Sequence, residues 1–225
     1  MEQLPLYTKI IFILTTLLAF LMLYKASSYS KAIIVIMLLW LAVQSVISLT
    51  GFYTVTDVMP PRFTLLVLPP ILLIAGVFFT NKGKTFIDTL DIKVLTLIHV
   101  VRIPVELTLY FLYLHKVIPE IMTFEGRNFD ILSGLSAPVI YYFGYIKNVF
   151  GKKIMIAWNI VCLLLLLNIV TTAVLSAPFP FQQFGFDQPN IAILYFPFIW
   201  VPCFIVPIVL FSHLVVIRRL IKSGN

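Results

Sequence analysis

The stretch VLTLIHVVRIPVELTLYFLYL, residues 94–114, is long and apolar enough to cross a membrane, yet it contains three ionisable side chains. A hydrocarbon core about 30 Å thick requires about 20 apolar residues of helix. His99, Arg102 and Glu106 are three and four residues apart, so a helix carries them on one face over roughly 10 Å of its axis. A charge at bilayer depth costs about 3 kcal/mol or more, and such residues usually face a partner or a cavity. The stretch therefore predicts a membrane helix with a functional face.

The rest of the chain also has the composition of a membrane protein. Of its 225 residues, 61% are hydrophobic and 11% are charged, whereas soluble domains carry about 25% charged residues. Long apolar runs are separated by short polar breaks. This pattern predicts an all-α membrane protein with seven transmembrane helices in a single polytopic domain, 1–225. The expected spans are approximately 8–25, 32–51, 63–80, 93–117, 131–146, 154–176 and 190–217.

The placement of Lys and Arg indicates the orientation. Eleven basic residues fall on one side of these spans and four on the other, while Arg102 lies within the membrane. The larger set is Lys25, Lys31, Lys82, Lys84, Lys93, Lys147, Lys152, Lys153, Arg218, Arg219 and Lys222, and the smaller set is Lys9, Arg62, Lys116 and Arg127. Because basic residues collect on the cytoplasmic side, we expect the N-terminus outside and the C-terminus in the cytoplasm of a plasma (inner) membrane protein. The chain has no arginine-rich run, and we expect no nucleic-acid partner.

An internal repeat is one interpretation of the order of the spans. A shift of 128 residues aligns the second and third spans with the sixth and seventh, and it matches Pro61 with Pro189 and Pro69 with Pro197. This alignment suggests a 3+1+3 parallel repeat in which the fourth span is the linker. The layout resembles the sugar transporters built from two three-helix repeats, in topology and length only, and without their Pro-Gln motif no residue role is transferred. Retinal-binding proteins share seven helices but need a lysine in the last span, and 191–217 has none.

The fourth span offers a candidate binding site. Arg102 and Glu106 form an i,i+4 pair and are expected to neutralise each other in part. Pro104 lies between them and cannot donate a hydrogen bond to the carbonyl four residues earlier. The freed carbonyl and the guanidinium together can bind a polar ligand, and Tyr110 continues this face outward while His99 continues it inward. A buried ion pair that only fixes helix packing is the alternative interpretation.

The connection between the fourth and fifth spans is dense in charge. Glu125, Arg127, Asn128 and Asp130 make a candidate outer gate, and an ordinary solvated loop is the alternative. Their spacing matches no Ca²⁺-binding loop. Asp130 begins the fifth span, where a carboxylate can cap the helix N-terminus.

Two histidines are expected at a similar depth near the cytoplasmic face. His99 lies six residues inside Lys93, and His213 lies five residues inside Arg218. Histidines at one depth on different helices can ligate a haem or a metal, so this ligation is kept as an alternative to unrelated side chains. The main expectation is that the protein has no cofactor.

The motifs of soluble enzymes are absent: the chain has no GxSxG, HExxH or GxGxxG. We expect a transporter or channel-like protein for a small polar or amphiphilic solute, with proton coupling as an option. Arg102 would bind an anionic group of the solute, Glu106 would be a protonatable partner and His99 would relay protons. A membrane enzyme or haem protein acting on a lipophilic substrate is the alternative, and a seven-helix sensor is the third hypothesis. The expected partners are the lipid bilayer and a small-molecule ligand.

Overall fold

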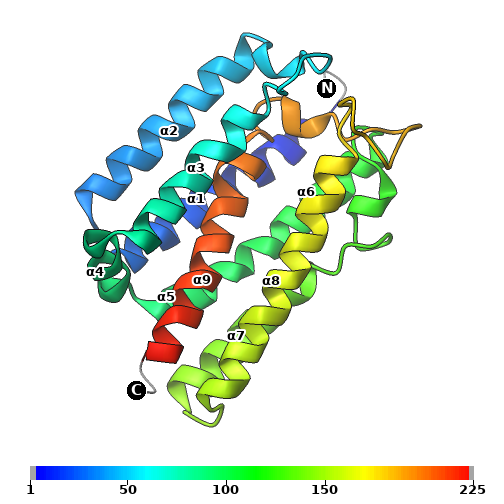
Figure 1. The fold of residues 1–225 in the computed structure, drawn as a ribbon. Coiled ribbons are helices and arrows are strands. Elements are labelled where there is room, and N and C mark those ends of the chain that lie inside the picture. Colours follow the sequence, from blue (N-terminus) through cyan, green and yellow to red (C-terminus); the bar gives the residue numbers. More distant parts are fainter. Residues whose placement is uncertain (1–3, 223–225) are drawn as a thin grey trace.

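Helical segments run back and forth along the molecule, and each expected span contains one of them (Figure 1). The computed structural model describes residues 4–222, and within these residues the chain is helical with no strand. The α-helices are α1 (Leu6–Ala26), α2 (Lys31–Leu49), α3 (Thr64–Phe79), α4 (Asn81–Thr89), α5 (Ile92–Leu97), α6 (Arg102–Leu114), α7 (Ile131–Tyr141), α8 (Lys152–Leu175) and α9 (Val206–Lys222). Short 3₁₀ or π segments are η1 (Phe52–Thr54), η2 (Ile98–Val101), η3 (Glu120–Met122), η4 (Tyr142–Ile146), η5 (Ala192–Leu194) and η6 (Val201–Ile205).

Several of these segments are long and apolar enough to cross a membrane. Among the described residues there are five: Leu6–Ala26, Lys31–Leu49, Ile92–Leu114, Lys152–Leu175 and Val201–Lys222. The pair α3 and α4 also qualifies, bent by 92° at the break between them, which brings the number to six. The apolar segment Ile131–Ile146, formed by α7 and η4, is shorter than the others.

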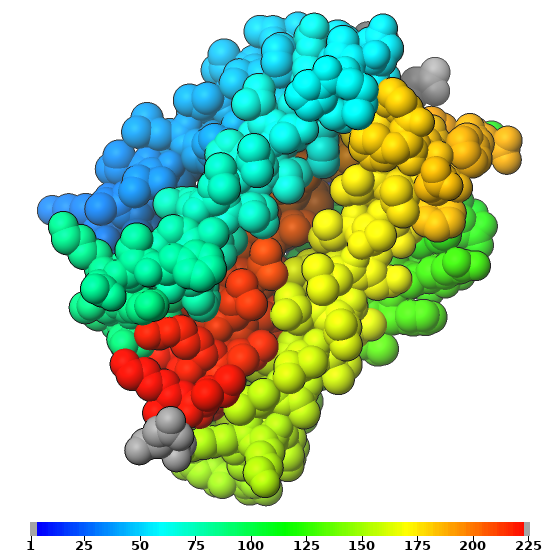
Figure 2. Space-filling view, viewed as in Figure 1, coloured from blue at the N-terminus to red at the C-terminus, as the bar shows by residue number. Residues whose placement is uncertain are grey.

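The outer surface of the bundle is hydrocarbon, as a bilayer requires. Leu39 and Val46 on α2 are 62% and 63% exposed, and Leu72 on α3 is 60% exposed. Figure 2 shows α9 lying between α3 with α4 on one side and α8 on the other. The side chains of α9 are largely buried there, so α9 is a central helix of the bundle.

The bend between α3 and α4 follows from two small residues. The hydroxyl of Thr80 caps α4 by accepting a hydrogen bond from the backbone N–H of Gly83 at 3.1 Å. A Cβ at Gly83 would lie 2.2 Å from the carbonyl oxygen of Val77, so only glycine permits this return of the chain. At the other end of α4, the carboxylate of Asp88 accepts a hydrogen bond from Arg218 on α9 at 2.6 Å. These contacts fold α4 back against the end of α9.

The expected span 190–217 is wrong at its start, because the last helix begins about ten residues later. Residues 190–200 form turns and η5, and the helix starts with the π segment η6 before it continues as α9. Prolines 197, 202 and 207 explain this irregular start, since proline has no N–H for a helical hydrogen bond. Pro207 leaves the carbonyl of Cys203 without its i+4 donor, and the indole N–H of Trp40 on α2 donates to that carbonyl at 2.8 Å.

The suggested repeat does not extend to this helix. A shift of 128 residues aligns α3 with residues 192–207, whose first half is turns and η5. Pro69 lies inside α3, whereas Pro197 lies before the last helix. The expected equivalence of these two prolines is therefore wrong.

Candidate functional site

The three ionisable residues of the fourth span all point into the protein. His99 is fully buried, and Arg102 and Glu106 are 2% and 1% exposed. The segment Ile92–Leu114 that carries them changes from α-helix to 3₁₀ helix over Ile98–Val101 and then continues as α6. This tighter turn accompanies the donor missing at Pro104, whose i−4 carbonyl lies within it. The burial agrees with the energetic argument from the sequence.

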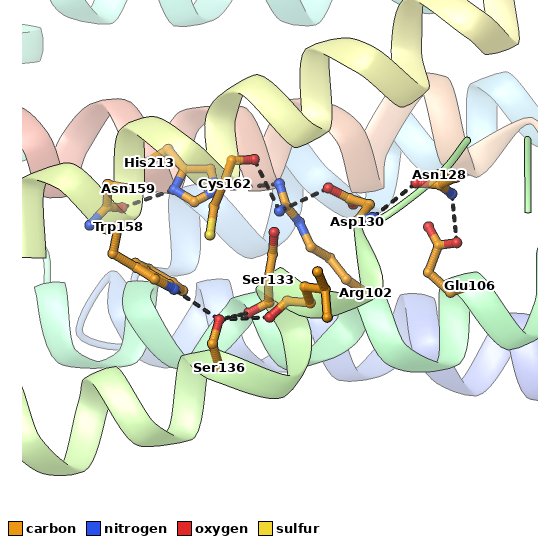
Figure 3. A network of polar contacts seen from close by, with 11 residues as sticks. Arg102, Glu106, Asn128, Asp130, Ser133, Ser136, Trp158, Asn159, Cys162 and His213 are labelled. Carbon is orange, nitrogen blue, oxygen red and sulfur yellow. Dashed lines mark hydrogen bonds and ion pairs between the residues drawn. The ribbon is translucent and has the colours of Figure 1, made fainter. Parts of the chain in front are cut away.

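Arg102 is paired with Asp130 and not with Glu106, which corrects the expected i,i+4 pair (Figure 3). Its Nη1 lies 3.0 Å from Oδ1 of Asp130 and donates to the carbonyl of Cys162 on α8 at 3.3 Å. Its Nη2 lies 3.3 Å from Nε2 of His213 on α9. The side chain of Arg102 therefore reaches across the interior and joins α6, α7, α8 and α9.

Glu106 is held by the loop that precedes α7. The amide of Asn128 donates to Oε2 of Glu106 at 2.6 Å and to the carbonyl of Met122 at 3.0 Å. The amide oxygen of Asn128 accepts the backbone N–H of Asp130 at 3.0 Å. Asn128 is fully buried, so one amide side chain links the carboxylate of Glu106 to the backbone of Asp130.

Asp130 does not cap α7 with its side chain, contrary to the expectation. Its carboxylate is 6% exposed and faces the guanidinium of Arg102 instead. An ion pair in the interior satisfies Arg102, whereas an exposed cap would leave that cation without a counterion.

The hydrogen bonds of His213 define its tautomer. A guanidinium has no acceptor, so Nε2 of His213 must accept from Arg102 and the proton must sit on Nδ1. The N–H at Nδ1 donates a hydrogen bond to Oδ1 of Asn159 at 2.9 Å. The amide of Asn159 in turn donates to the carbonyl of Met155 at 2.8 Å. His213 is therefore a neutral imidazole, on the side of Arg102 away from Glu106 in the network.

His99 stacks on His213 and has no hydrogen-bond partner. Their ring centroids are 3.8 Å apart with an interplanar angle of 16°, and Trp158 meets His99 edge-on at 5.6 Å. Both nitrogens of His99 are buried and unpartnered among the described residues. The lone pair of an imidazole lies in the ring plane, so two stacked rings do not direct nitrogens at a common atom. Within residues 4–222 no group of three or more His, Cys, Asp or Glu side chains is placed to hold a metal ion, and ligation by His99 and His213 stays a prediction.

The candidate outer gate is divided between the interior and the surface. Asn128 and Asp130 are buried in the network, whereas Glu125 and Arg127 are exposed. Tyr110 is half-buried toward the C-terminal end of α6, where its ring centroid lies 4.9 Å from that of Phe124. The candidate residues named from the sequence therefore include six members of one buried cluster: His99, Arg102, Glu106, Asn128, Asp130 and His213.

The loop before α7 enters the bundle, and the sequence did not indicate this depth. Gly134, one turn into α7, packs so closely on the carbonyl of His99 and on Ile103 that a Cβ there would lie 3.2 and 2.8 Å from them. His99 and Ile103 are in the middle of Ile92–Leu114. Because Gly134 is one turn into α7, α7 begins only about one turn, roughly 5 Å, from the level of the middle of that segment. On α8, Asn168 donates to the carbonyl of Arg127 at 2.9 Å.

Sequence reasoning did not assign Asn159, Ser136 and Trp158 to the site. Asn159 contacts His213, and the indole N–H of Trp158 donates to the hydroxyl of Ser136 at 2.8 Å. An asparagine in an otherwise apolar span indicates a buried polar contact, but the sequence does not give its partner.

A family described as "Domain of unknown function (DUF8737)" matches residues 59–221, and the chain belongs to this family. The matched range extends from before α3 to the last turn of α9, so it contains the whole polar network. No curated protein and no solved structure matches the chain.

Proposed function

We propose that this family member is an integral membrane transporter or channel-like protein that moves a small polar or amphiphilic solute of anionic character together with protons. The loop that enters the bundle to meet Arg102 carries this proposal. Non-helical backbone at membrane depth is tolerated where it is buried in protein or lines a pathway. A short turn at the membrane surface would connect α6 to α7 without placing Asn128 and Asp130 in the interior.

The proposed topology has seven spans with the N-terminus outside and the C-terminus in the cytoplasm. The end of α1, the start of α2, α4, the turn between α7 and α8, and the end of α9 gather at one end of the bundle (Figure 1), and these parts carry most of the basic residues. Positive charge at that end favours the cytoplasmic side. Ile131–Ile146 would be the fifth span, and it need not be longer because it begins below the outer ends of α6 and α8.

The ion pair of Arg102 with Asp130 suggests how solute and proton are coupled. In the described state the carboxylate of Asp130 neutralises the guanidinium at 3.0 Å. A solute carboxylate that binds Arg102 must displace that of Asp130, and a buried Asp130 without its counterion favours the protonated form. One anion and one proton then enter together and the net charge of the site does not change. We therefore propose electroneutral symport.

Glu106 and the histidines extend this pathway in both directions. Glu106 is one amide away from Asp130 on the outer side, since Asn128 bonds both residues. On the inner side Arg102 contacts His213, and His99 stacks on that ring with both nitrogens free of partners in the described part of the chain. In this scheme Glu106 loads the proton and the two imidazoles release it inward.

Proton movement in vesicles tests this proposal. Purified protein is reconstituted into liposomes containing a pH-sensitive dye, and a panel of mono- and dicarboxylates and acidic amino acids is added outside. We expect at least one of these anions to acidify the interior, with the same rate when K⁺ and valinomycin clamp the membrane potential.

Two variants separate the site from the exposed loop. Glu106→Gln should abolish anion-driven acidification, whereas Glu125→Gln removes an exposed carboxylate from the same region and should retain it. Absence of acidification with every anion, or a wild-type rate in Glu106→Gln, would overturn the proposal.

A further inference from the structure

A second candidate site lies apart from the polar network. A cavity of about 330 Å³ is lined by residues of α1, α2, α3, α4 and the last helix. None of the residues that line it belongs to the network around Arg102. Its volume is in the range of small-molecule sites.

The lining offers hydrocarbon and almost no hydrogen-bonding groups. The indole of Trp40 is one of its few polar groups, and the N–H of that indole already donates to the carbonyl of Cys203. Pro69, Pro70 and Pro207 contribute ring carbons. A polar solute would lose its hydration in this cavity without replacement, so the cavity suits an apolar chain.

The cavity opens toward the lipid-facing surface between α2 and α3. These helices make little contact with each other along their length. The lining residues Ile36 on α2 and Leu73 on α3 are 55% and 59% exposed. In a bilayer, lipid acyl chains contact this opening, so they are the most abundant ligand that could enter the cavity.

Lysines on α1, α2 and α4 lie close in sequence to residues that line one end of the cavity, and we call these lysines the rim. In each of α1, α2 and α4 a lysine lies two residues from a lining residue in the sequence: Lys25 after Leu23, Lys31 before Ile33, and Lys84 before Phe86. Lys82 lies one half-turn further along α4. All four lysines are exposed, and within residues 4–222 none of them forms an ion pair.

The carboxylate of α4 does not neutralise this rim. Asp88 is paired with Arg218 at 2.6 Å and with Lys222 at 2.7 Å. The lysines therefore place unneutralised positive charge on the helix segments that line one end of the apolar cavity.

We propose that the cavity holds one acyl chain of an anionic phospholipid from the inner leaflet, whose phosphate lies on the lysine rim. Hydrocarbon complements the lining, and the phosphate complements the lysines. The acyl chain would fill the space between α2 and α3, and the phosphate would bind the lysines of α4, so the lipid would hold α4 against both helices. This site is independent of the proposed transport.

Native mass spectrometry of the delipidated full chain tests the site with defined lipids. The probes are phosphatidylglycerol and phosphatidylcholine with identical chains, and a free fatty acid of the same chain length. We expect one phosphatidylglycerol to bind with an affinity about tenfold or more above that of phosphatidylcholine. The fatty acid should bind more weakly than phosphatidylglycerol.

Three variants locate the lipid. Leu73→Trp fills the cavity from an exposed position and should abolish the tightly bound lipid, and Ile36→Trp serves the same purpose from α2 if Leu73→Trp does not fold. The triple variant Lys31→Gln, Lys82→Gln and Lys84→Gln should remove the preference for phosphatidylglycerol. The matched control Lys93→Gln, Lys147→Gln and Lys153→Gln removes three exposed lysines from the same end of the bundle and should keep that preference.

The proposal would be overturned by retention of the bound lipid in the cavity-filling variants or by an equal affinity for the two phospholipids. A fatty acid that displaces phosphatidylglycerol would assign the cavity to a different ligand and would also refute the proposal. Anion-driven acidification is measured separately in liposomes of pure phosphatidylcholine, which contain no anionic lipid. Because transport does not require the bound lipid, the lipid-site proposal and the transport proposal can fail independently.

Discussion

At the scale of single residues, the charge of Arg102 decides the arrangement of the site. A guanidinium that is 2% exposed within a membrane helix requires a counterion and further acceptors. Asp130, the carbonyl of Cys162 and His213 supply them. Each partner comes from a different element, so the ionised side chain specifies how these elements pack.

Removing Asp130 should therefore destabilise the protein strongly. Asp130→Asn leaves Arg102 as a buried cation without its counterion, and we expect a loss of about 3 kcal/mol or more in unfolding free energy. Asp57→Asn, which changes an exposed carboxylate, should have little effect. Unfolding in detergent measures both variants. Equal stability of Asp130→Asn and the wild type would mean that the ion pair contributes nothing to the fold.

The sequence predicted which residues are buried but not which residues they contact. The spacing of His99, Arg102 and Glu106 indicated one inward face, and the high cost of a charge in lipid made their burial predictable. The same spacing favoured Glu106 as the partner of Arg102. The true partner, Asp130, lies 28 positions away in the chain, and helix periodicity carries no information about a contact between helices.

At the scale of elements, glycine and proline set the helix contacts. Gly134 lets α7 approach the middle of the fourth span, because small residues allow close contact between helices. Proline removes backbone donors in the last helix and thereby delays its start. The prolines are evident in the sequence, but the residue at which the helix begins is not. The freed carbonyl of Cys203 accepts a hydrogen bond from Trp40 on α2, and the sequence does not reveal this contact between distant residues.

The packing at Gly134 gives a matched pair of alanine substitutions. Gly134→Ala places a methyl group 2.8 Å from Cγ1 of Ile103 and should destabilise the protein by about 1–3 kcal/mol. At Gly76 on α3 no neighbouring atom lies within 4 Å of the position that a Cβ would take, so Gly76→Ala should be neutral or stabilise by about 0.5–1 kcal/mol. Thermal unfolding of the two variants compares them. The reverse order of stability would contradict this packing.

The attachment of α4 to α9 should depend on pH. Hydrogen bonds from Lys222 and Arg218 lower the pKa of Asp88 from 3.8 to about 2. Because the folded-state pKa lies below the ordinary value, the attachment is fully stabilised above the ordinary pKa and weakens as the pH falls toward 2. Hydrogen exchange of α4 amides, relative to α8 amides in the same sample, should show this transition in the wild type. If Asp88→Asn shows the same transition, another group is responsible.

At the scale of the whole molecule, the charge asymmetry predicts the orientation. Gln183 lies in the loop between α8 and η5, and Lys153 lies at the start of α8, so the proposed topology puts them on opposite sides of the membrane. The native cysteines Cys162 and Cys203 are buried. A membrane-impermeant maleimide added to intact cells should therefore label Gln183→Cys and not Lys153→Cys. Labelling of Lys153→Cys alone would reverse the orientation.

Length and hydropathy placed a helical segment in every expected span, because both properties are local to the chain. The depth of the loop before α7 is a property of the whole molecule. Its charged residues suggested a solvated connection, yet Asn128 and Asp130 are buried because Glu106 and Arg102 inside the bundle offer them partners. A buried site that forms between two polar segments cannot be predicted from the sequence of either segment alone.

We propose that the ion pair of Arg102 with Asp130 serves transport and not only packing. Replacing both partners with apolar residues of similar size, Arg102→Met with Asp130→Leu, removes both charges of the ion pair together, and such replacements are often neutral or stabilising. The most direct measurement compares thermal unfolding and anion-driven acidification in this one variant. We predict stability close to that of the wild type and no acidification. Acidification at the wild-type rate in the folded double variant would contradict the claim and would leave the ion pair a packing contact.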